Sequence, residues 1–303
     1  MGYAVVIGAV NLDIGGSVSR PLVCRDSNPG KVSSSPGGVG HNIARNLCLL
    51  DVPTKLLTVL GDDSFAQKIL EHAAEAGLDF SAAETIVGEE TSTYLFVSGP
   101  DGEMEIAVSD MAIADQITPA FLEQRMALIN GASICVVDTN FPAESLLFLT
   151  QHCTVPIFAD PVSTVKAQKL RPILGKLHTI KPNRLEAEVL SGVKIHSEAD
   201  LPLAASVLLA EGLQQVFISL GEDGVYAMDS SGREAVVPNP PRHVRNATGS
   251  GDAMTAALAA AYLRGYDLLQ AAEIGVAAGA MTAESPETIH PDLSWTTLCA
   301  RSV

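Results

Sequence analysis

The sequence is poor in positive charge. It has 19 Lys and Arg against 35 Asp and Glu over 303 residues, which gives a formal net charge of −16. Non-specific binding of nucleic acid depends on basic side chains that release counterions from phosphates, and an acidic surface also repels anionic lipid. We therefore exclude nucleic-acid polymers and membrane surfaces as partners of this protein.

Cysteines are few and widely spaced, and long apolar runs are missing. The five cysteines show no CxxC or Cys/His spacing, which excludes a zinc site and a disulfide framework and indicates reduced core thiols. The alanine-rich run 256–263 is far shorter than the roughly 18 apolar residues of a membrane span. Residues 3–10 have no basic flank and predict a buried strand, not a signal peptide. We expect a soluble, cytoplasmic protein.

Several motifs of nucleotide-binding and hydrolytic enzymes are absent. The pattern GxxxxGK[ST] does not occur, which excludes a P-loop, and no GxGxxG follows the first predicted strand, which disfavours a dinucleotide site. The seven histidines show no HExxH spacing, and no GxSxG is present. Metalloprotease and hydrolase chemistry of the usual kinds is therefore excluded.

Short apolar runs alternate with longer amphipathic segments along most of the chain, which predicts an α/β fold with a parallel sheet covered by helices. Polar residues follow these runs, as Asp138 and Asp160 do. Because ligands of open α/β sheets bind at the carboxyl ends of the strands, we expect one site there. The runs that predict strands are Tyr3–Val10, Ile134–Val137, Val155–Ala159, Leu177–Ile180 and Val216–Leu220.

Two segments break this alternation. Residues 91–108 predict a β-hairpin around a Gly99–Gly102 turn, and residues 13–35 are rich in Ser, Gly and β-branched residues. Together they predict a small β-sheet lid, about residues 13–35 and 88–110, that closes over bound substrate. No linker or repeat divides residues 1–303, so we expect a single domain. The exposed edges of such a lid need cover, which predicts a homodimer through the lid.

The sequence around Asp252 is the strongest indication of chemistry. Gly249, Ser250 and Gly251 precede it at the entrance to a helix that runs to Leu263, so that several backbone N–H groups converge on one point. Such an anion hole stabilises charge on a transferred phosphoryl group, while Asp252 accepts the proton of a substrate hydroxyl. The alternative is an ordinary first-turn acid favoured by the helix dipole. The local pattern does not decide between them.

A second glycine cluster, residues 36–40, opens the amphipathic helix predicted for Ile43–Leu50. Its paired glycines, Gly37 and Gly38, allow a ligand to approach the backbone, and Asn42 is placed to hydrogen-bond sugar hydroxyls. The alternative is a glycine-rich turn in which Asn42 caps the helix.

Asn183 and Glu186 stand at another helix start, directly after a predicted strand, with the spacing of a capping box. Glu186 is also suited to organise the water shell of a Mg²⁺ ion on a nucleotide, and both roles can coexist. The strand-turn-strand 218–226 is either simple hairpin punctuation or, if a nucleotide binds, a place where Ser219 lies beside the phosphates.

The order of these motifs resembles that of the ribokinase-like (PfkB-type) carbohydrate kinases over nearly the whole chain. The resemblance is carried by Asn11-Leu12-Asp13, by Gly37-Gly38 with Asn42, by Thr248 to Asp252, and by an NxxE element at Asn183 and Glu186. It implies a three-layer α/β/α core with a mostly parallel sheet and a small β-sheet lid. It also implies transfer of the γ-phosphoryl group of ATP to a primary alcohol, with Mg²⁺.

The resemblance also implies roles for individual residues. Asp252 would be the base, and Gly249, Ser250 and Gly251 the anion hole. Substrate hydroxyls would be held by Asn11, Asp13, Gly37, Gly38 and Asn42. The ATP site would comprise Asn183, Ser219, Gly221, Gly224, Thr248 and Val276, with Glu186 serving Mg²⁺ through water.

Finer features look like the pseudouridine kinase branch of this family, which phosphorylates a C-nucleoside at its 5′-hydroxyl. They are the segments 26–31, 36–44, 160–163 and 181–188. The polar residues offered to a uracil edge are Ser27, Asn28, Thr91, Thr93 and Asn140. Two alternatives stay open: a kinase of the same family for another nucleoside or a sugar or sugar acid, and a non-catalytic sensor that keeps the fold.

The sequence departs from the family pattern near the anion hole and near the adenine. Family members often bind a monovalent cation there, which would place K⁺ at Asn246 and Thr248, but Asn246 is neutral where many members have Asp. The K⁺ requirement therefore stays open. Val276 replaces a residue that is often polar, which implies an apolar slot for the base.

Overall fold

One sheet of eight strands forms the centre of the computed structural model, which describes residues 2–240 and 243–302. The strand order is β14-β13-β12-β11-β10-β9-β1-β4, and all neighbours from β12 to β4 are parallel, whereas β13 and β14 are antiparallel. The strands are β1 (Ala4–Ile7), β4 (Thr54–Leu57), β9 (Ile134–Asp138), β10 (Ile157–Asp160), β11 (Thr179–Ile180), β12 (Gln215–Ser219), β13 (Val225–Asp229) and β14 (Glu234–Val237).

The five strands expected from apolar runs are all confirmed, although β1 stops at Ile7 instead of Val10. Strand β1 is buried along its whole length, and its side chains alternate between two cores. Val6 packs into one hydrophobic cluster, whereas Val5 and Ile7 pack into the other. Two buried faces explain why these strands read as continuous apolar runs.

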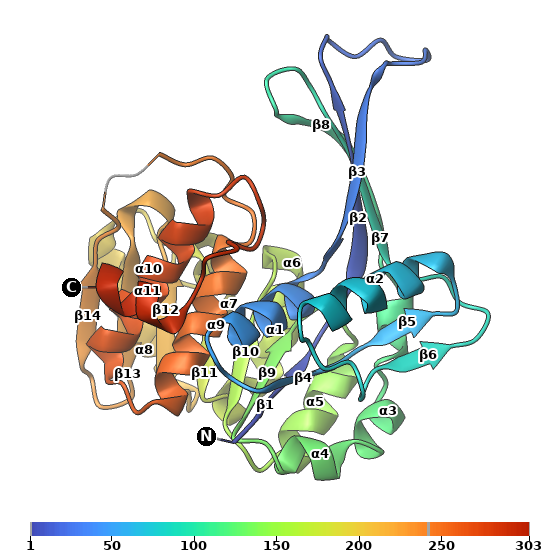
Figure 1. Cartoon of the computed structure of the whole chain (residues 1–303). Helices are drawn as coiled ribbons and strands as arrows, with labels where there is room; N and C mark the ends of the chain where they lie inside the picture. Colours follow the sequence, from blue (N-terminus) through green and yellow to red (C-terminus); the bar gives the residue numbers. More distant parts are fainter. Residues whose placement is uncertain (1, 241–242, 303) are drawn as a thin grey trace.

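Helices cover both faces of this sheet and complete three layers (Figure 1). The first cluster joins the sheet to α1 (Val39–Leu49), α2 (Ser64–Glu75), α9 (Ser250–Leu263), α10 (Leu268–Ala283) and α11 (Trp295–Arg301). The second joins it to α3 (Pro119–Glu123), α4 (Met126–Asn130), α5 (Ala143–His152), α6 (Thr164–Ala167), α7 (Arg184–Ser191) and α8 (Leu201–Ala210). Short 3₁₀ segments are η1 (Ala112–Gln116), η2 (Gln168–Lys176), η3 (Glu198–Asp200) and η4 (Gly221–Asp223).

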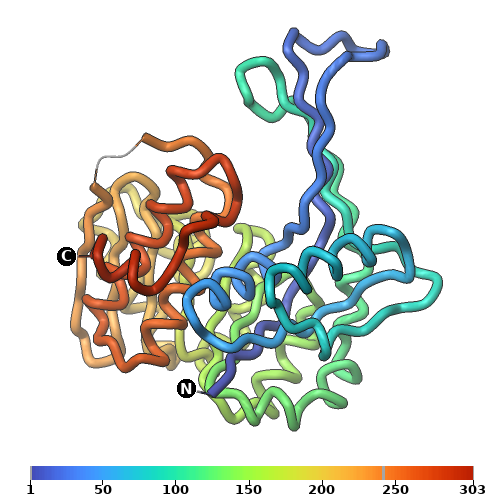
Figure 2. The backbone as a smooth tube through the Cα atoms, in the orientation of Figure 1, coloured from blue at the N-terminus to red at the C-terminus, as the bar shows by residue number. Residues whose placement is uncertain are grey.

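A separate four-stranded sheet forms the lid and stands away from the core (Figures 1 and 2). Its order is β3-β2-β7-β8, from β2 (Asn11–Val18), β3 (Gly30–Gly37), β7 (Thr93–Ser98) and β8 (Met104–Asp110). Both hairpins are antiparallel, and β2 pairs with β7 in parallel. A two-stranded sheet of β5 (Val59–Gly61) and β6 (Glu84–Ile86) lies beside the lid's base.

The five cysteines are unpaired, and their burial differs from the expectation. Cys135 is buried in β9, but Cys24 is exposed at the lid tip and the other three are half-buried. The expectation of core thiols therefore holds for Cys135 and is wrong for Cys24. Among the described residues, no helix has the length and apolarity required to cross a membrane.

Candidate active site

Polar residues gather where four parallel strands end, as the sequence predicts. Asp138 ends β9, Asp160 ends β10, Lys181 follows β11 and Ser219 ends β12. Asp138 is fully buried, and its Oδ2 accepts hydrogen bonds of 2.9 Å from the backbone N–H groups of Ala9 and Gly40. This carboxylate therefore ties the residues that follow β1 to the start of α1, the helix that the glycine cluster 36–40 opens.

Helix α9 begins at this edge with Gly249 as its N-cap residue. Gly249 has φ +84°, and a Cβ atom there would overlap the backbone oxygen of Thr288. Only glycine fits both conditions. The first N–H groups of a helix have no partner within it, so those of Gly251 and Asp252 are available to an anion. The buried Ser250 hydroxyl has no hydrogen-bond partner either.

Asp252 lies in the first turn of α9 and contacts the second glycine-opened helix. The Asn42 side-chain amide donates a hydrogen bond of 2.8 Å to its Oδ2. Asn42 is inside α1, whose N-cap is Gly38, so the alternative in which Asn42 caps this helix is wrong. The two motifs, 210 residues apart in the sequence, thus meet at one carboxylate.

The surroundings of Asp252 favour its protonated form. Burial and the nearby Asp160 carboxylate raise the pKa of Asp252 to about 8, although the Asn42 hydrogen bond and the Lys181 ammonium oppose this effect. The residue keeps partial exposure, so a ligand can reach it. A carboxyl group with a pKa close to neutrality is suited to exchange a proton with a hydroxyl.

His41 is a buried residue next to Asn42 that sequence reasoning missed. Its Nδ1 lies 3.2 Å from the Asn42 Oδ1. Burial lowers the pKa of His41 to about 4, so the ring is neutral at neutral pH. An amide oxygen only accepts, which assigns the proton to Nδ1. His41 therefore orients the Asn42 amide so that its NH₂ group faces Asp252.

The base of the lid contributes a second polar pair. The Asn11 amide donates a hydrogen bond of 2.6 Å to Asp13 Oδ1, and Asp13 faces Gly37 on the paired strand. Burial raises the pKa of Asp13. The structure therefore brings Asn11, Asp13 and Gly37 together where the lid joins the core.

Strand register places Thr93 away from this pair. Thr93 pairs with Leu12, whereas Tyr94 pairs with Asp13, and paired residues share a face of the sheet. Tyr94 and its neighbour Phe96, with ring centroids 5.9 Å apart, therefore lie on the Asp13 face. The alternation of side chains along the strand shows that Thr93 and Tyr94 lie on opposite faces. Only the register of β7 against β2 decides which of the two faces contains Asp13.

The remaining residues predicted to contact substrate are less concentrated. The hydroxyl of Thr91 donates to Asp63 at 2.8 Å and accepts from the N–H of Gly61, so it serves a structural contact. Ser27 and Asn28 lie in the loop at the lid tip, where the Asn28 amide bonds the backbone of Val23 and Asp26.

Asn140 lies just beyond β9, at the same edge as Asp138. Its backbone N–H donates to Asp138 Oδ1 at 2.8 Å, and its side-chain oxygen accepts a hydrogen bond of 2.5 Å from Lys166 Nζ. Of the five residues offered to a base edge, Asn140 is therefore the one that lies among the acids of the strand ends.

The predicted nucleotide side is partly assembled. Asn183 and Glu186 form a complete capping box, with hydrogen bonds of 2.9 and 2.8 Å, and Asn183 pairs with Ser219 of the next strand. Glu186 is only 4% exposed, and burial raises its pKa. Within the described ranges, no group of three or more His, Cys, Asp or Glu side chains could cage a metal ion.

Two of the predicted glycines lie in the turn between β12 and β13, whereas Val276 lies elsewhere. Gly221 has φ +68° and Gly224 φ +101°, and a Cβ at Gly224 would overlap the backbone oxygen of Val237. Val276 is a buried residue of α10 that packs in the first hydrophobic cluster.

Asn246 joins two loops in front of α9. Its amide nitrogen donates to the backbone oxygen of Pro286 at 3.2 Å, and its Oδ1 accepts from the N–H of Thr248 at 3.0 Å. Both polar atoms of Asn246 are therefore engaged, whereas Thr248 is exposed.

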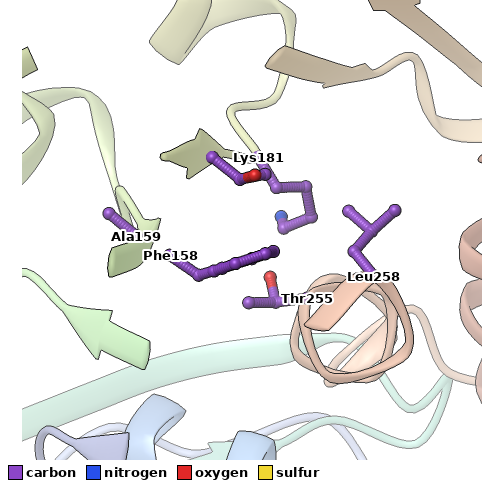
Figure 3. Close-up of a pocket in the computed structure, with 6 residues that line it drawn as sticks. Phe158, Ala159, Lys181, Thr255 and Leu258 are labelled. Atoms are coloured by element: carbon purple, nitrogen blue, oxygen red, sulfur yellow. The ribbon is translucent and has the colours of Figure 1, made fainter. Parts of the chain in front are cut away.

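Lys181 is one of the polar residues predicted at the strand ends, but the sequence assigned it no role in the site. Its buried ammonium lies 3.4 Å from Asp160 Oδ2 and points toward α9 between Phe158 and Leu258 (Figure 3). It stands two residues before Asn183, but a lone lysine gives no sequence signal of its burial.

Comparisons with known proteins agree on one family. A family model described as pfkB family carbohydrate kinase matches residues 1–295. The chain is 38% identical over 293 residues to the pseudouridine kinase of Escherichia coli (strain K12), covering 96% of this chain and 94% of that protein. It is 35% identical over 293 residues to the uncharacterised sugar kinase YeiI of the same organism, covering 96% and 81%.

A solved structure supports the same fold. The ribokinase of Arabidopsis thaliana, complexed with ribose and ATP, superposes with a TM-score of 0.87 at 20% identity, covering 99% of this chain and 98% of that one. The central sheet, the two helical layers and the lid therefore form a ribokinase-like fold.

Proposed function

The chain belongs to the pfkB family of carbohydrate kinases, and on this basis we propose that it transfers the γ-phosphoryl group of ATP to the 5′-hydroxyl of pseudouridine. The products would be pseudouridine 5′-phosphate and ADP. The observation that carries the catalytic part is the placement of Asp252, hydrogen-bonded to Asn42 and seated in the first turn of a helix with free N–H groups.

In the proposed reaction, the chain's own residues position the acceptor and stabilise charge. Asp252 accepts the proton of the acceptor hydroxyl while the hydroxyl oxygen bonds to the γ-phosphorus of ATP. The bond from that phosphorus to the leaving ADP breaks. At the anion hole of Gly249, Ser250 and Gly251, the N–H groups of Gly251 and Asp252 would face the charge on the transferred group, because the Ser250 N–H already donates to the Ala247 backbone oxygen at 3.3 Å. Phosphoryl transfer depends mainly on such positioning and electrostatic stabilisation, so few side chains are required.

The acceptor would bind between the lid base and α1. Asn11, Asp13 and Asn42 would hold its hydroxyls, and Gly37 and Gly38 would let it approach the backbone. We add Tyr94 and Phe96 as the lid residues that face a bound base, because they share the face of Asp13. Closure of the lid would exclude water, which would otherwise take the phosphoryl group.

We place ATP along α9 and the β12–β13 turn. The proposed contacts are Asn183, Ser219, Gly221, Gly224, Thr248 and Val276. Mg²⁺ fits the donor set, because it keeps several waters and takes few protein ligands. Glu186 offers one such carboxylate, since its Oε2 accepts the Asn183 N–H and Oε1 remains for a water. Bound to the phosphates, Mg²⁺ would neutralise charge that develops on them.

We propose pseudouridine as the acceptor for two reasons. The 38% identical relative is a pseudouridine kinase, and segments 26–31 and 181–188 resemble the pseudouridine kinase branch of the family. The similarity to YeiI, at 35%, keeps another nucleoside or a sugar as the second candidate. A nucleoside sensor without activity is disfavoured by the intact contact between Asn42 and Asp252.

Turnover with a set of alternative acceptors tests this proposal. ADP formation from Mg-ATP would be measured with pseudouridine, uridine, ribose and fructose as acceptors. We expect the highest kcat/KM with pseudouridine. Turnover with another acceptor alone would reject pseudouridine and keep the kinase. Binding of a nucleoside by calorimetry with no turnover of any acceptor would instead favour a sensor.

We also propose a homodimer formed through the lid. The face opposite Asp13 is apolar, because register places Val32, Leu95, Ile106 and Val108 on one side. Their exposed fractions are 79%, 44%, 57% and 60%. An exposed apolar face on a sheet with open edges is a candidate for burial against a second copy.

Replacing Ile106 by Glu should therefore convert the dimer to a monomer, because a charge would enter the buried face. Sedimentation velocity at micromolar concentration measures this change. Val165→Glu is the matched control, since Val165 is 76% exposed on α6, outside the lid. A wild-type monomer, or an Ile106→Glu protein that still sediments as the control does, would contradict the lid dimer.

A further inference from the structure

A single buried cation lies among four acids at the catalytic edge of the sheet. Lys181 is 6% exposed and, of the lysines and arginines in residues 2–240 and 243–302, it is the one that is buried. Asp138, Asp160 and Glu186 are buried around the strand ends, and Asp252 is partly exposed. Unbalanced charge is costly in such surroundings, so the position of one ammonium group matters.

Asp160 fixes this ammonium beneath α9. Its Oδ2 lies 3.4 Å from Lys181 Nζ and also accepts a hydrogen bond of 2.8 Å from the Thr255 hydroxyl. Thr255 is one helical turn after Asp252. A Cβ at Gly251 would lie 3.2 Å from Lys181 Nζ, so the ammonium sits directly against the first turn of α9.

The space beside this pair is closed to water, and apolar side chains form part of its lining. Phe158, Ala159 and Leu258 line the space beside the Lys181 side chain, and that space does not admit a water molecule (Figure 3). Charges that water does not screen interact strongly, so Lys181 and the nearby carboxylates are coupled electrostatically.

A hydrogen bond from a strained residue fixes the other oxygen of the Asp160 carboxylate. Val162 has φ +64°, which is unfavourable for a β-branched residue, and its N–H donates to Asp160 Oδ1 at 2.9 Å. Such a conformation persists only where the surrounding structure enforces it. Both Asp160 oxygens thus have fixed partners, and the ammonium has a fixed position.

We propose that Lys181, held by Asp160, is a positioning residue whose charge stabilises the ionised form of Asp252, the form that accepts a proton. The role of Asp252 as acceptor rests on the proposed function, whereas the charge coupling does not. The groups facing Asp252 are Asn42 on α1, Asp138 and Asp160 at the ends of β9 and β10, and Lys181.

Some of these groups raise the pKa of Asp252 and others lower it, so their effects can be separated. Burial, Asp160 and Asp138 raise the pKa of Asp252, and Asn42 and Lys181 lower it. Burial alone would lower the pKa of Lys181, but Asp160, Glu186 and Asp252 outweigh it and raise this pKa. Lys181 therefore stays charged wherever Asp252 titrates.

Direct titration of Asp252 tests the proposal without any acceptor. Protein labelled with ¹³Cγ-aspartate would be titrated by NMR, with the resonance assigned through Asp252→Asn. We expect Lys181→Met to raise the pKa of Asp252 by about one pH unit and Asp160→Asn to lower this pKa. Lys55→Met is the matched control, because Lys55 pairs at 2.5 Å with Asp79, outside the site.

A folded Lys181→Met protein whose Asp252 titrates as in the wild type would overturn the proposal. If Lys181→Met alone does not fold, the double variant Lys181→Met/Asp160→Asn, which removes both charges, is compared with Asp160→Asn. The pKa of Asp252 should be higher in the double variant, and an equal pKa overturns the proposal. In the pH profile of kcat/KM with pseudouridine and Mg-ATP, the midpoint of the acidic limb should shift in the same direction as the Asp252 pKa in each variant. Wild-type inactivity toward pseudouridine would reject the substrate and leave the NMR test intact.

Discussion

Replacing Asp252 by Asn should reduce kcat by about 10²–10⁴-fold, the usual contribution of a general base. The amide keeps an oxygen that can accept from Asn42, so the acceptor and ATP should bind with little change in Kd. Turnover would be measured by ADP release, and binding by calorimetry with acceptor and a non-hydrolysable ATP analogue.

A first-turn acid on another helix provides the control. Glu144 lies in the first turn of α5, which follows β9, and its side chain is exposed. Glu144→Gln removes an acid from a helix N-terminus in the same way and should leave kcat unchanged. If Asp252→Asn also keeps wild-type turnover, Asp252 is only an acid favoured by the helix dipole, and the proposed mechanism fails.

Replacing Gly249 by Ala should reduce kcat by about 10²–10³-fold, the usual cost of losing one oxyanion donor. The added methyl group would overlap the backbone oxygen of Thr288, so the chain must shift at the point where the N–H groups converge. We also expect a lower melting temperature, because the left-handed conformation at φ +84° disfavours alanine.

Gly265 gives a matched comparison at the other end of the same helix. It has φ +74°, but a Cβ there would meet no atom within 4 Å. Gly265→Ala should cost about 1–2 kcal/mol of stability from backbone strain and keep wild-type kcat. Equal loss of kcat in both variants would mean that strain, not the anion hole, limits turnover.

Much of the central sheet is predictable because strands such as β1, β9 and β10 are buried on both faces. Val5 and Val6 point to opposite cores, so an uninterrupted apolar run is required and is easy to recognise. The start of α9 is also predictable, because a cluster of small residues directly before a long helix-forming run is typical of a helix entrance that binds an anion.

Contacts between distant segments could not be predicted from local patterns. Asn42 looked equally suited to cap its helix, and only the packing of α1 against α9 shows that it faces Asp252. Thr93 and Tyr94 differ by one position in a strand, and pairing with β2 decides which one faces the site. Lys181 carries no sign of burial in its own sequence, because burial depends on Asp160 and Gly251.

The base of the lid lies close to the proposed acceptor site. Strand β2 begins at Asn11, four residues after β1 ends, and its eight residues span about 27 Å. A rotation of the lid about this base would move the tip by an amount proportional to that length, while Asn11 and Asp13 would barely move. The tip of a lid that closes in this way can therefore move by several ångströms while Asn11 and Asp13, which are proposed to hold the acceptor, stay in contact with it.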